Sequence, residues 1–153
     1  MKTVTGDILE LAENGTFDVV IHGCNCEHLM ASGLSKQVRD QYPDAYAADQ
    51  NFTFPIFGDQ LGLISGARVY RKNGSGYFHI INAYTQLHAR GDGVLTDYRA
   101  VRSAFRNVKN NFAGSKIAYP KIGAGKGRGD WNTISQIIET ELKGEDHTLV
   151  VLP

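Results

Sequence analysis

The chain has 153 residues, of which 42% are hydrophobic, 10% aromatic and 21% charged, and 16 Lys and Arg residues balance 16 Asp and Glu residues. This length is typical of a single domain with one hydrophobic core, so we expect residues 1–153 to form one domain, and the composition excludes disordered, collagen-like and membrane-embedded chains. A net charge of zero also excludes a general positive field of the kind that drives non-specific nucleic-acid binding, so any anionic ligand must be held by local geometry.

Two features of the sequence bear on the compartment. The only two cysteines, Cys24 and Cys26, are too close for an easy unstrained disulfide, which fits a reducing environment. Residues 1–7 contain no apolar signal core, and no apolar run approaches the roughly 20 residues that span a bilayer. We therefore expect a cytoplasmic monomer that makes no membrane contact.

The first half of the chain predicts two strands followed by a broken helix. Residues 2–5 and 16–23 are rich in Val, Ile, Thr and Phe, as strands are. Residues 34–46 carry apolar side chains at four-residue steps, which predicts an amphipathic helix that Pro43 interrupts. Residues 67–71 and 77–82 are two further β-prone runs around a turn-rich linker, which predicts an antiparallel hairpin.

The second half predicts helices and strands in alternation. Apolar residues at steps of three and four predict a helix over residues 98–112, with Asp97 in the capping region and Gly114 beyond its end. A strand at 116–120, a helix over 131–142 and a last strand over 147–152 follow. This order predicts a three-layer α/β/α sandwich with a mixed, mostly parallel sheet, in which ligands bind outside the carboxyl ends of the strands.

A glycine-rich loop lies between the strand at 116–120 and the helix that follows. Residues 123, 125, 127 and 129 are all glycine, with Lys126 and Arg128 among them. Glycine lacks a Cβ and permits positive φ, so consecutive N–H groups can converge on an oxyanion at a helix start. The spacing fits neither a P-loop nor a dinucleotide fingerprint. The loop is therefore interpreted as a phosphate cradle, and the alternative is a flexible loop with solvated cations.

A second loop, residues 22–33, also connects a strand to a helix and ends in the small residues 31–33. Two such loops facing each other would suit a diphosphate, one phosphate to each. The spacing of His22, Cys24, Cys26 and His28 leaves zinc binding as an alternative. A histidine-activated cysteine nucleophile is another alternative, and small buried core cysteines are the third.

Taken together in chain order, these residues resemble the macrodomains, a family that binds ADP-ribose in a crevice on an α/β/α sandwich. The resemblance covers essentially the whole chain and rests on residues 6–8, 21–26, 30–35 and 119–125 together with the last strand. It is strongest toward the branch that contains the fungal-type ADP-ribose-1''-phosphate phosphatase, related phage proteins and the terminal ADP-ribose glycohydrolase. The string His-Gly-Cys-Asn-Cys at 22–26 indicates the phosphatase side, and the phage relatives imply a bacterial host's cytoplasm.

The resemblance implies a set of ligand-binding residues. Asp7 would accept a hydrogen bond from the adenine amine, with Gly6 and Ile8 beside it and Leu152 packed near the ring. The remaining implied residues surround the diphosphate and are Met30, Ser32, Gly33, Leu34, Ser35, Pro120, Ile122, Gly123, Ala124, Gly125, Lys126 and Gly127.

Catalytic candidates follow from the same resemblance and its departures. Glycohydrolase relatives use a lysine at the end of the strand that here runs to residue 84, and an aspartate where Gly127 stands, so lysine-dependent chemistry is not expected. For phosphatase chemistry, His22 is the acid or base and Asn25 the positioner, unless His22 is a core residue. Asp130 is either a catalyst or a helix N-cap. Residues 88–93 either close over the distal ribose or form a plain surface loop.

The expected function is hydrolysis of ADP-ribose-1''-phosphate to ADP-ribose and phosphate, without metal or redox cofactor. One alternative is a non-catalytic module that binds free or protein-linked ADP-ribose. Another is a hydrolase that removes ADP-ribose from proteins or nucleic acid.

Overall fold

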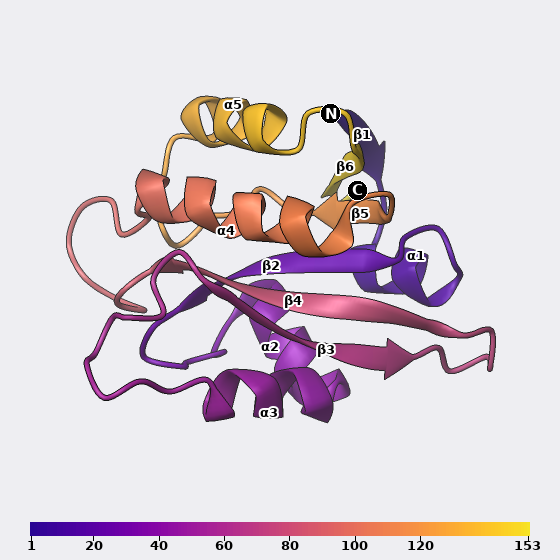
Figure 1. Ribbon diagram of the computed structural model, residues 1–153, viewed down its shortest axis with the longest axis horizontal. Coiled ribbons are helices and arrows are strands. Elements are labelled where there is room, and N and C mark those ends of the chain that lie inside the picture. Colours follow the sequence, from indigo (N-terminus) through magenta and orange to yellow (C-terminus); the bar gives the residue numbers. More distant parts are fainter.

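The computed structural model describes residues 1–153 and has a six-stranded sheet at its centre (Figure 1). The strand order is β1-β6-β5-β2-β4-β3. Every neighbouring pair is parallel except β3 and β4, which form the predicted antiparallel hairpin. The strands are β1 (Lys2–Thr5), β2 (Val19–Asn25), β3 (Ile64–Tyr70), β4 (Tyr77–Gln86), β5 (Lys116–Tyr119) and β6 (Asp146–Val151).

Helices cover both faces of this sheet (Figure 1). They are α1 (Ile8–Glu13), α2 (Gly33–Gln41), α3 (Pro43–Asn51), α4 (Tyr98–Phe112) and α5 (Trp131–Glu141). Successive residues of a strand point to opposite faces, so Val20 packs with α1, α2 and α3, whereas Val19 and Ile21 pack with α4 and α5. The two hydrophobic clusters lie on opposite sides of the sheet, and the predicted three-layer sandwich is confirmed.

The elements differ from the predictions mainly around α1 to α3. The helix predicted over 34–46 is interrupted at Pro43 as expected, since α2 ends before it and α3 starts with it, but α3 continues to Asn51. Proline lacks the N–H that a helix interior needs but is tolerated in the first turn. Helix α1 was not predicted, and it has only six residues.

The topology places five connecting segments at one edge of the sheet. Strands β1, β6, β5, β2 and β4 run parallel, so the segments after Thr5, Asn25, Gln86, Tyr119 and Val151 all leave from the same edge. Both loops singled out in the sequence are among them. This is the edge at which α/β sheets bind ligands.

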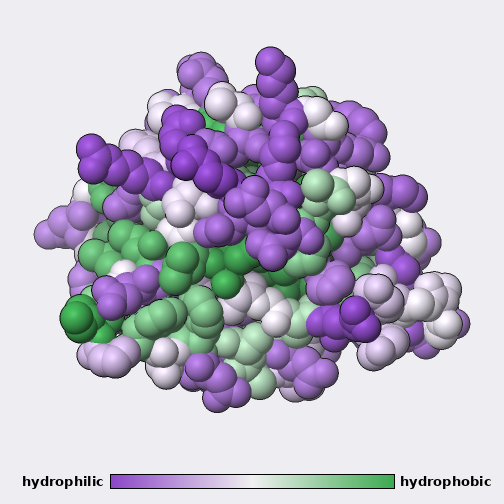
Figure 2. Space-filling view, in the orientation of Figure 1, coloured by the Kyte–Doolittle hydropathy of each residue, from purple (hydrophilic) through white to green (hydrophobic).

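The surface is mostly hydrophilic, with one hydrophobic band. Figure 2 shows this band across the middle of the face in view, below the hydrophilic atoms that cover α4 and α5. Large apolar side chains are also exposed in the segment before β3, where Ile56 is 66% and Phe57 55% exposed. Phe57 stacks on His88, with ring centroids 5.4 Å apart. No helix has the length and apolar character that a bilayer crossing requires.

Candidate functional site

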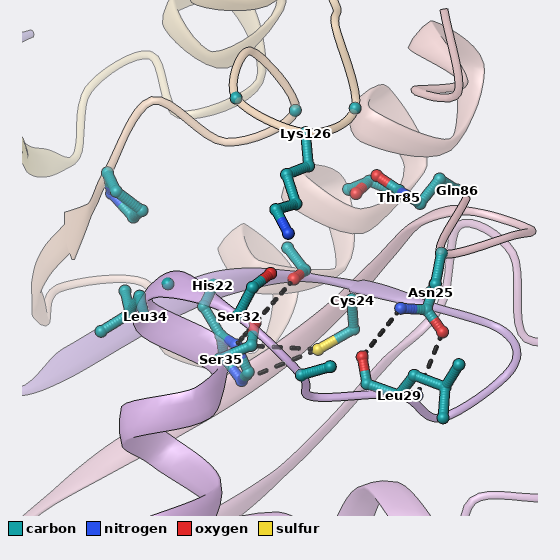
Figure 3. A pocket seen from close by; sticks show the side chains of 18 of the residues that line it. His22, Cys24, Asn25, Leu29, Ser32, Leu34, Ser35, Thr85, Gln86 and Lys126 are labelled. Atoms are coloured by element: carbon teal, nitrogen blue, oxygen red, sulfur yellow. Dashed lines mark hydrogen bonds between the residues drawn. The ribbon is translucent and has the colours of Figure 1, made fainter. Parts of the chain in front are cut away.

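A cleft of about 380 Å³ lies at the carboxyl edge of the sheet, between the loop after β2 and the loop after β5 (Figure 3). Segments from four parts of the chain line it, including the end of β4 and the loop that follows. The structure brings together in its lining most of the residues predicted to contact the diphosphate or the distal ribose. These are His22, Asn25, Ser32, Gly33, Leu34, Ser35, Pro120, Gly123, Gly125, Lys126 and Gly127.

The charged residues that line the cleft are all cationic. Arg90, Lys121 and Lys126 line it, and no aspartate or glutamate does. None of the three takes part in an ion pair of the chain. In a protein of zero net charge, this local excess of positive charge marks the cleft as a site for an anion.

The glycines of the loop after β5 serve two purposes. A Cβ on Gly127 would overlap the hydroxyl oxygen of Thr96, and one on Gly129 would lie 2.7 Å from the Gly123 carbonyl oxygen. Gly123 itself has φ +77° and packs on Thr96. A Cβ on Gly125, by contrast, would meet nothing within 4 Å. Three of the glycines therefore let the loop pack against the protein, and only Gly125 faces open space.

Arg128 holds this loop to the segment after β4. Its Nε donates a hydrogen bond of 2.5 Å to the carbonyl of Gly93, and its Nη2 donates to the carbonyl of Gly91. Arg128 is therefore an exposed cation that ties two loops together, and it is not part of the cleft lining. The segment that it holds brings Ala89 and Arg90 into the lining, so the loop predicted as a closing segment does border the cleft.

An Asp side chain caps the start of α1, α4 and α5, but no side chain caps the start of α2. Asp7, Asp97 and Asp130 each accept a hydrogen bond from a first-turn amide of α1, α4 and α5. Ser32, the N-cap of α2, accepts none with its side chain. The first N–H groups of a helix have no partner within the helix. At α2 they are therefore left without a capping side chain, at the lining of the cleft.

Asp130, one of the predicted catalytic residues, is a helix cap. Its Oδ2 accepts hydrogen bonds from the Thr133 amide at 3.0 Å and the Thr133 hydroxyl at 2.7 Å. These bonds lower the pKa of the Asp130 carboxyl, and the side chain does not line the cleft. Asp130 is thus the N-cap of α5, which gives its catalytic interpretation no support, and a catalytic role for Asp130 stays a prediction.

His22 is buried, with 1% exposure, and both ring nitrogens are hydrogen-bonded. Nδ1 lies 2.9 Å from the Ser35 hydroxyl and Nε2 lies 2.5 Å from Oδ1 of Asn82. The Asn82 amide nitrogen donates to the Ala45 carbonyl and the Ser65 hydroxyl, so Oδ1 faces the ring and Nε2 carries the proton. Burial lowers the pKa of His22, which favours the neutral ring, and with Nε2 protonated the lone pair on Nδ1 faces the Ser35 hydroxyl.

Asn25 lines the cleft but also shapes its own turn. Its amide nitrogen donates to the Leu29 carbonyl at 2.9 Å, and its Oδ1 accepts from the Glu27 and Leu29 amides at 3.1 and 3.2 Å. The side chain is 9% exposed. Asn25 therefore fixes the loop after β2, and its contact with a ligand stays a prediction.

The arrangement does not support the zinc alternative, although Cys24 Sγ does contact the His22 ring, at 3.8 Å from Nδ1 and 3.7 Å from Nε2. His22, Cys24, Cys26 and His28 form no cluster that could hold a metal ion. His28 instead pairs with Asp49, with 2.8 Å between Nδ1 and Oδ1. Burial raises the pKa of Cys24 well above its ordinary value and that of Cys26 to about 11. A raised pKa disfavours the thiolate, which is the nucleophilic form, so neither thiol gains support as a nucleophile, although Cys24 lines the cleft.

Three of the residues predicted to surround the diphosphate lie outside the lining of the cleft. Met30 and Ile122 are each 3% exposed and belong to the hydrophobic core. Ala124 is partly buried and packs on the α4–α5 side. These apolar side chains anchor the two loops to the core, and a contact between these residues and a ligand stays a prediction.

The residues predicted to hold adenine lie farther along the same edge. Gly6 donates its N–H to the Val151 carbonyl at 2.9 Å, which brings the ends of β1 and β6 together. Asp7 and Ile8 begin α1 there, and Leu152, 77% exposed, follows β6. None of them lines the cleft, and their contact with adenine stays a prediction.

Sequence reasoning missed several lining residues. Leu29 and Ala31 lie in the first loop, and Lys121 in the second. Thr85 and Gln86 end β4, which extends beyond the predicted 77–82. Thr85 is 1% exposed and its hydroxyl oxygen has no hydrogen-bond partner in the protein. The β-prone residues at 83–85 could have indicated that the strand continues to Thr85 and Gln86.

No family model matches the chain. Among solved structures, it is similar to the DarG macrodomain of Mycobacterium tuberculosis, at 20% identity and a TM-score of 0.72 over 99% of this chain and 96% of that one. It is also similar to Thermosipho africanus DarTG in complex with ADP-ribose, at 19% identity and a TM-score of 0.71 over 99% of this chain and 41% of that one. The fold is thus that of the macrodomains, as the sequence predicted.

A curated protein of similar sequence shows the family to which the chain belongs. The chain is 33% identical over 147 residues to an uncharacterised 17.5 kDa protein of enterobacteria phage T4, covering 92% of this chain and 88% of the relative. The protein therefore belongs to the same family as this phage T4 protein, and it has the macrodomain fold.

Proposed function

We propose that the cleft binds ADP-ribose and that the protein hydrolyses the terminal phosphate of ADP-ribose-1''-phosphate. The observation that carries this proposal is the cleft itself, where three cations and the uncapped start of α2 meet with no carboxylate present. A diphosphate is the kind of group that such a site stabilises. The complex of the similar Thermosipho protein with ADP-ribose supports the choice of ligand.

The placement of the ligand follows the sheet edge. The diphosphate lies between the start of α2 and the exposed backbone at Gly125, beside Lys126. The adenine extends toward Asp7 and Leu152, beyond the cleft. The distal ribose lies at the opposite end, near Asn25 and Thr85. Thr85 contributes the unpartnered hydroxyl that a ribose hydroxyl can satisfy.

The charges at the distal end suit a further phosphate. Arg90 lines the cleft on the segment that Arg128 holds in place, and Lys126 points into the cleft from the other side (Figure 3). Cations so placed stabilise the negative charge of a phosphoryl group in the transition state. The end of β4 offers Thr85 and Gln86 instead of a lysine, which gives lysine-dependent removal of ADP-ribose from macromolecules no support.

Binding is tested by thermal unfolding with ADP-ribose, ADP and AMP. Ligand at 100 times its Kd adds about 2.7 kcal/mol, or roughly 5 to 10 °C for a domain of this size. We expect the largest rise with ADP-ribose. Lys126→Ala should weaken this rise, and Lys143→Ala, an exposed lysine outside the cleft, should leave it intact. No rise with ADP-ribose would refute the proposal.

Catalysis is tested by phosphate release from ADP-ribose-1''-phosphate. Release by the purified protein, lost in Arg90→Ala with ADP-ribose binding retained, is the expected result. The second candidate is a binding module without chemistry, and the absence of any carboxylate from the lining favours it. Binding of ADP-ribose without phosphate release would establish that second function in place of the first.

A further inference from the structure

Three side chains from three elements form a continuous hydrogen-bonded chain at the floor of the cleft. Ser35 of α2 lies 2.9 Å from Nδ1 of His22, and Nε2 of His22 lies 2.5 Å from Oδ1 of Asn82. His22 on β2 and Asn82 on β4 are direct partners in the parallel register. Their separation of 60 residues in sequence is thus closed by strand pairing.

The directions of these hydrogen bonds match the order of a nucleophile, a general base and a group that orients the base. The Asn82 amide nitrogen is occupied by Ala45 and Ser65, so its oxygen fixes the tautomer of His22. The free lone pair of His22 is then on Nδ1 and faces the Ser35 hydroxyl. A hydroxyl paired with a neutral imidazole that a third group orients is the arrangement of an activated serine.

Only one member of the chain reaches the cleft surface with a reactive group. His22 is 1% exposed and Asn82 is fully buried, whereas Ser35 is partly exposed and lines the cleft. Figure 3 shows Ser35 beside His22 at the floor of the cleft, with Lys126 approaching from the opposite loop. Ser35 also lies in the first turn of α2, whose N–H groups can stabilise an oxyanion formed nearby.

We propose that Ser35 is the nucleophile of this cleft, with His22 as its general base and Asn82 as a positioning residue. The proposal deepens the proposed function and rests on it for the identity of the substrate. The Ser35 oxygen attacks the terminal phosphorus, and its proton passes to Nδ1 of His22. The bond between phosphorus and the 1''-oxygen breaks, and His22 returns the proton to that oxygen, which releases ADP-ribose.

The second half of the cycle regenerates the serine. Water attacks the phosphorus of phosphoserine 35 while His22 accepts a proton from the water. The bond between phosphorus and the serine oxygen breaks, the proton returns to Ser35, and inorganic phosphate leaves. No oxidant, reductant or further reactant is needed.

A purely structural serine is the competing explanation. The Ser35 hydroxyl lies 3.3 Å from the Gly23 carbonyl and has one proton, which it can donate there or to His22, but not fully to both. If the Gly23 contact is the native one, Ser35 only ties α2 to β2, and its oxygen has no special reactivity. The experiment must therefore measure reactivity rather than stability.

The first measurement is covalent labelling of the full-length protein with a fluorophosphonate probe, followed by peptide mass mapping. We expect modification at Ser35, slowed by ADP-ribose and absent in Ser35→Ala. Ser135→Ala, which removes a helix serine outside the cleft, should be labelled like the wild type. His22→Asn should slow labelling about 100-fold, in keeping with loss of a general base. Absence of labelling at Ser35 in the folded wild type would overturn the proposal.

The second measurement is phosphate release by the same variants, together with intact mass of acid-quenched wild type to detect phosphoserine. Loss of release in Ser35→Ala, with ADP-ribose binding retained, supports the proposal. Retained release in that variant overturns the role of Ser35 while the proposed phosphatase function stands. His22-dependent labelling of Ser35 in a wild type that releases no phosphate supports the nucleophile and overturns the phosphatase function.

Discussion

The two sides of the cleft are built in different ways. On the α2 side, side chains do the positioning, because Ser35, His22 and Asn82 form a buried hydrogen-bonded chain. On the side of the loop after β5, the backbone does it, because glycines allow close packing on Thr96. Fixed side chains suit a reactive group, and a glycine-rich backbone with cations beside it suits an anion. The difference indicates a division between chemistry and binding, which the following substitutions test.

The largest expected loss of stability comes from the hydrogen-bonded chain on the α2 side of the cleft. Asn82→Ala removes the partner of His22 and the donor to the Ala45 and Ser65 oxygens, all within the protein interior. Buried polar groups left without partners cost about 1–3 kcal/mol, and the cavity adds to this, so we expect about 3 kcal/mol off the free energy of unfolding. Urea unfolding measures it. A loss below about 1 kcal/mol would show that water replaces these bonds.

In the loop after β5, adding a single methyl group to a glycine should lower the stability of the protein. Gly127→Ala places a Cβ against the Thr96 hydroxyl, and overpacking of this kind costs about 1–3 kcal/mol. Gly125→Ala is the matched change, since its Cβ meets nothing within 4 Å, and we expect a stability change within about 0.5 kcal/mol. Equal destabilisation of the two variants, measured by chemical denaturation, would contradict the division of roles among the glycines.

A smaller effect is expected where Arg128 joins the loops after β4 and β5. Arg128→Ala removes two hydrogen bonds to the carbonyls of Gly91 and Gly93. The side chain is exposed, so we expect a loss of about 1 kcal/mol or less. Amide hydrogen exchange should speed up in residues 89–95 and stay unchanged in β2. Unchanged exchange in residues 89–95 would show that other contacts hold this segment.

The smallest effect should come from mild acid. Burial lowers the pKa values of His22, His79 and His147 below their ordinary value of 6.5. Below pH 6.5 the unfolded chain takes up protons on these rings before the folded protein does, so stability falls as pH decreases toward the folded-state pKa values. Thermal unfolding at pH 7.5 and 5.5 should show a lower midpoint at pH 5.5. His22→Asn should reduce the difference, and an unchanged midpoint in the wild type would contradict the burial argument.

The fold was largely predictable from local pattern. Helix α4 begins and ends where its apolar spacing and Asp97 predicted, because an amphipathic helix of 15 residues repeats its signal several times. The hairpin of β3 and β4 was equally clear, since two β-prone runs flank a turn. Helix α1 was missed because six residues give too short a pattern to read.

The candidate site also has parts that the sequence predicted and parts that it did not. The two loops could be predicted because glycine, small residues and cations are a local composition that marks anion binding at helix starts. The expectation for Asp130 was left open in the sequence because an N-cap and a catalytic carboxylate look alike there. Its hydrogen bonds to Thr133 show that Asp130 is the N-cap of α5. The segment 88–93 was only one of two alternatives in the sequence, and Arg90 could not be singled out within it, because Arg128 holds this segment through bonds to two distant carbonyls.

By itself, the sequence determined the order of strands and helices, the layers that follow from it, and the edge of the sheet where a ligand would bind. These depend on residue spacing and on the handedness of chain connections, which act over short stretches. Only the tertiary structure decided that the His22 ring is buried and hydrogen-bonded between Ser35 and Asn82, and that the cleft contains cations without a carboxylate. Those properties arise from side chains 13 and 60 residues apart meeting in one place, and strand pairing and burial set them.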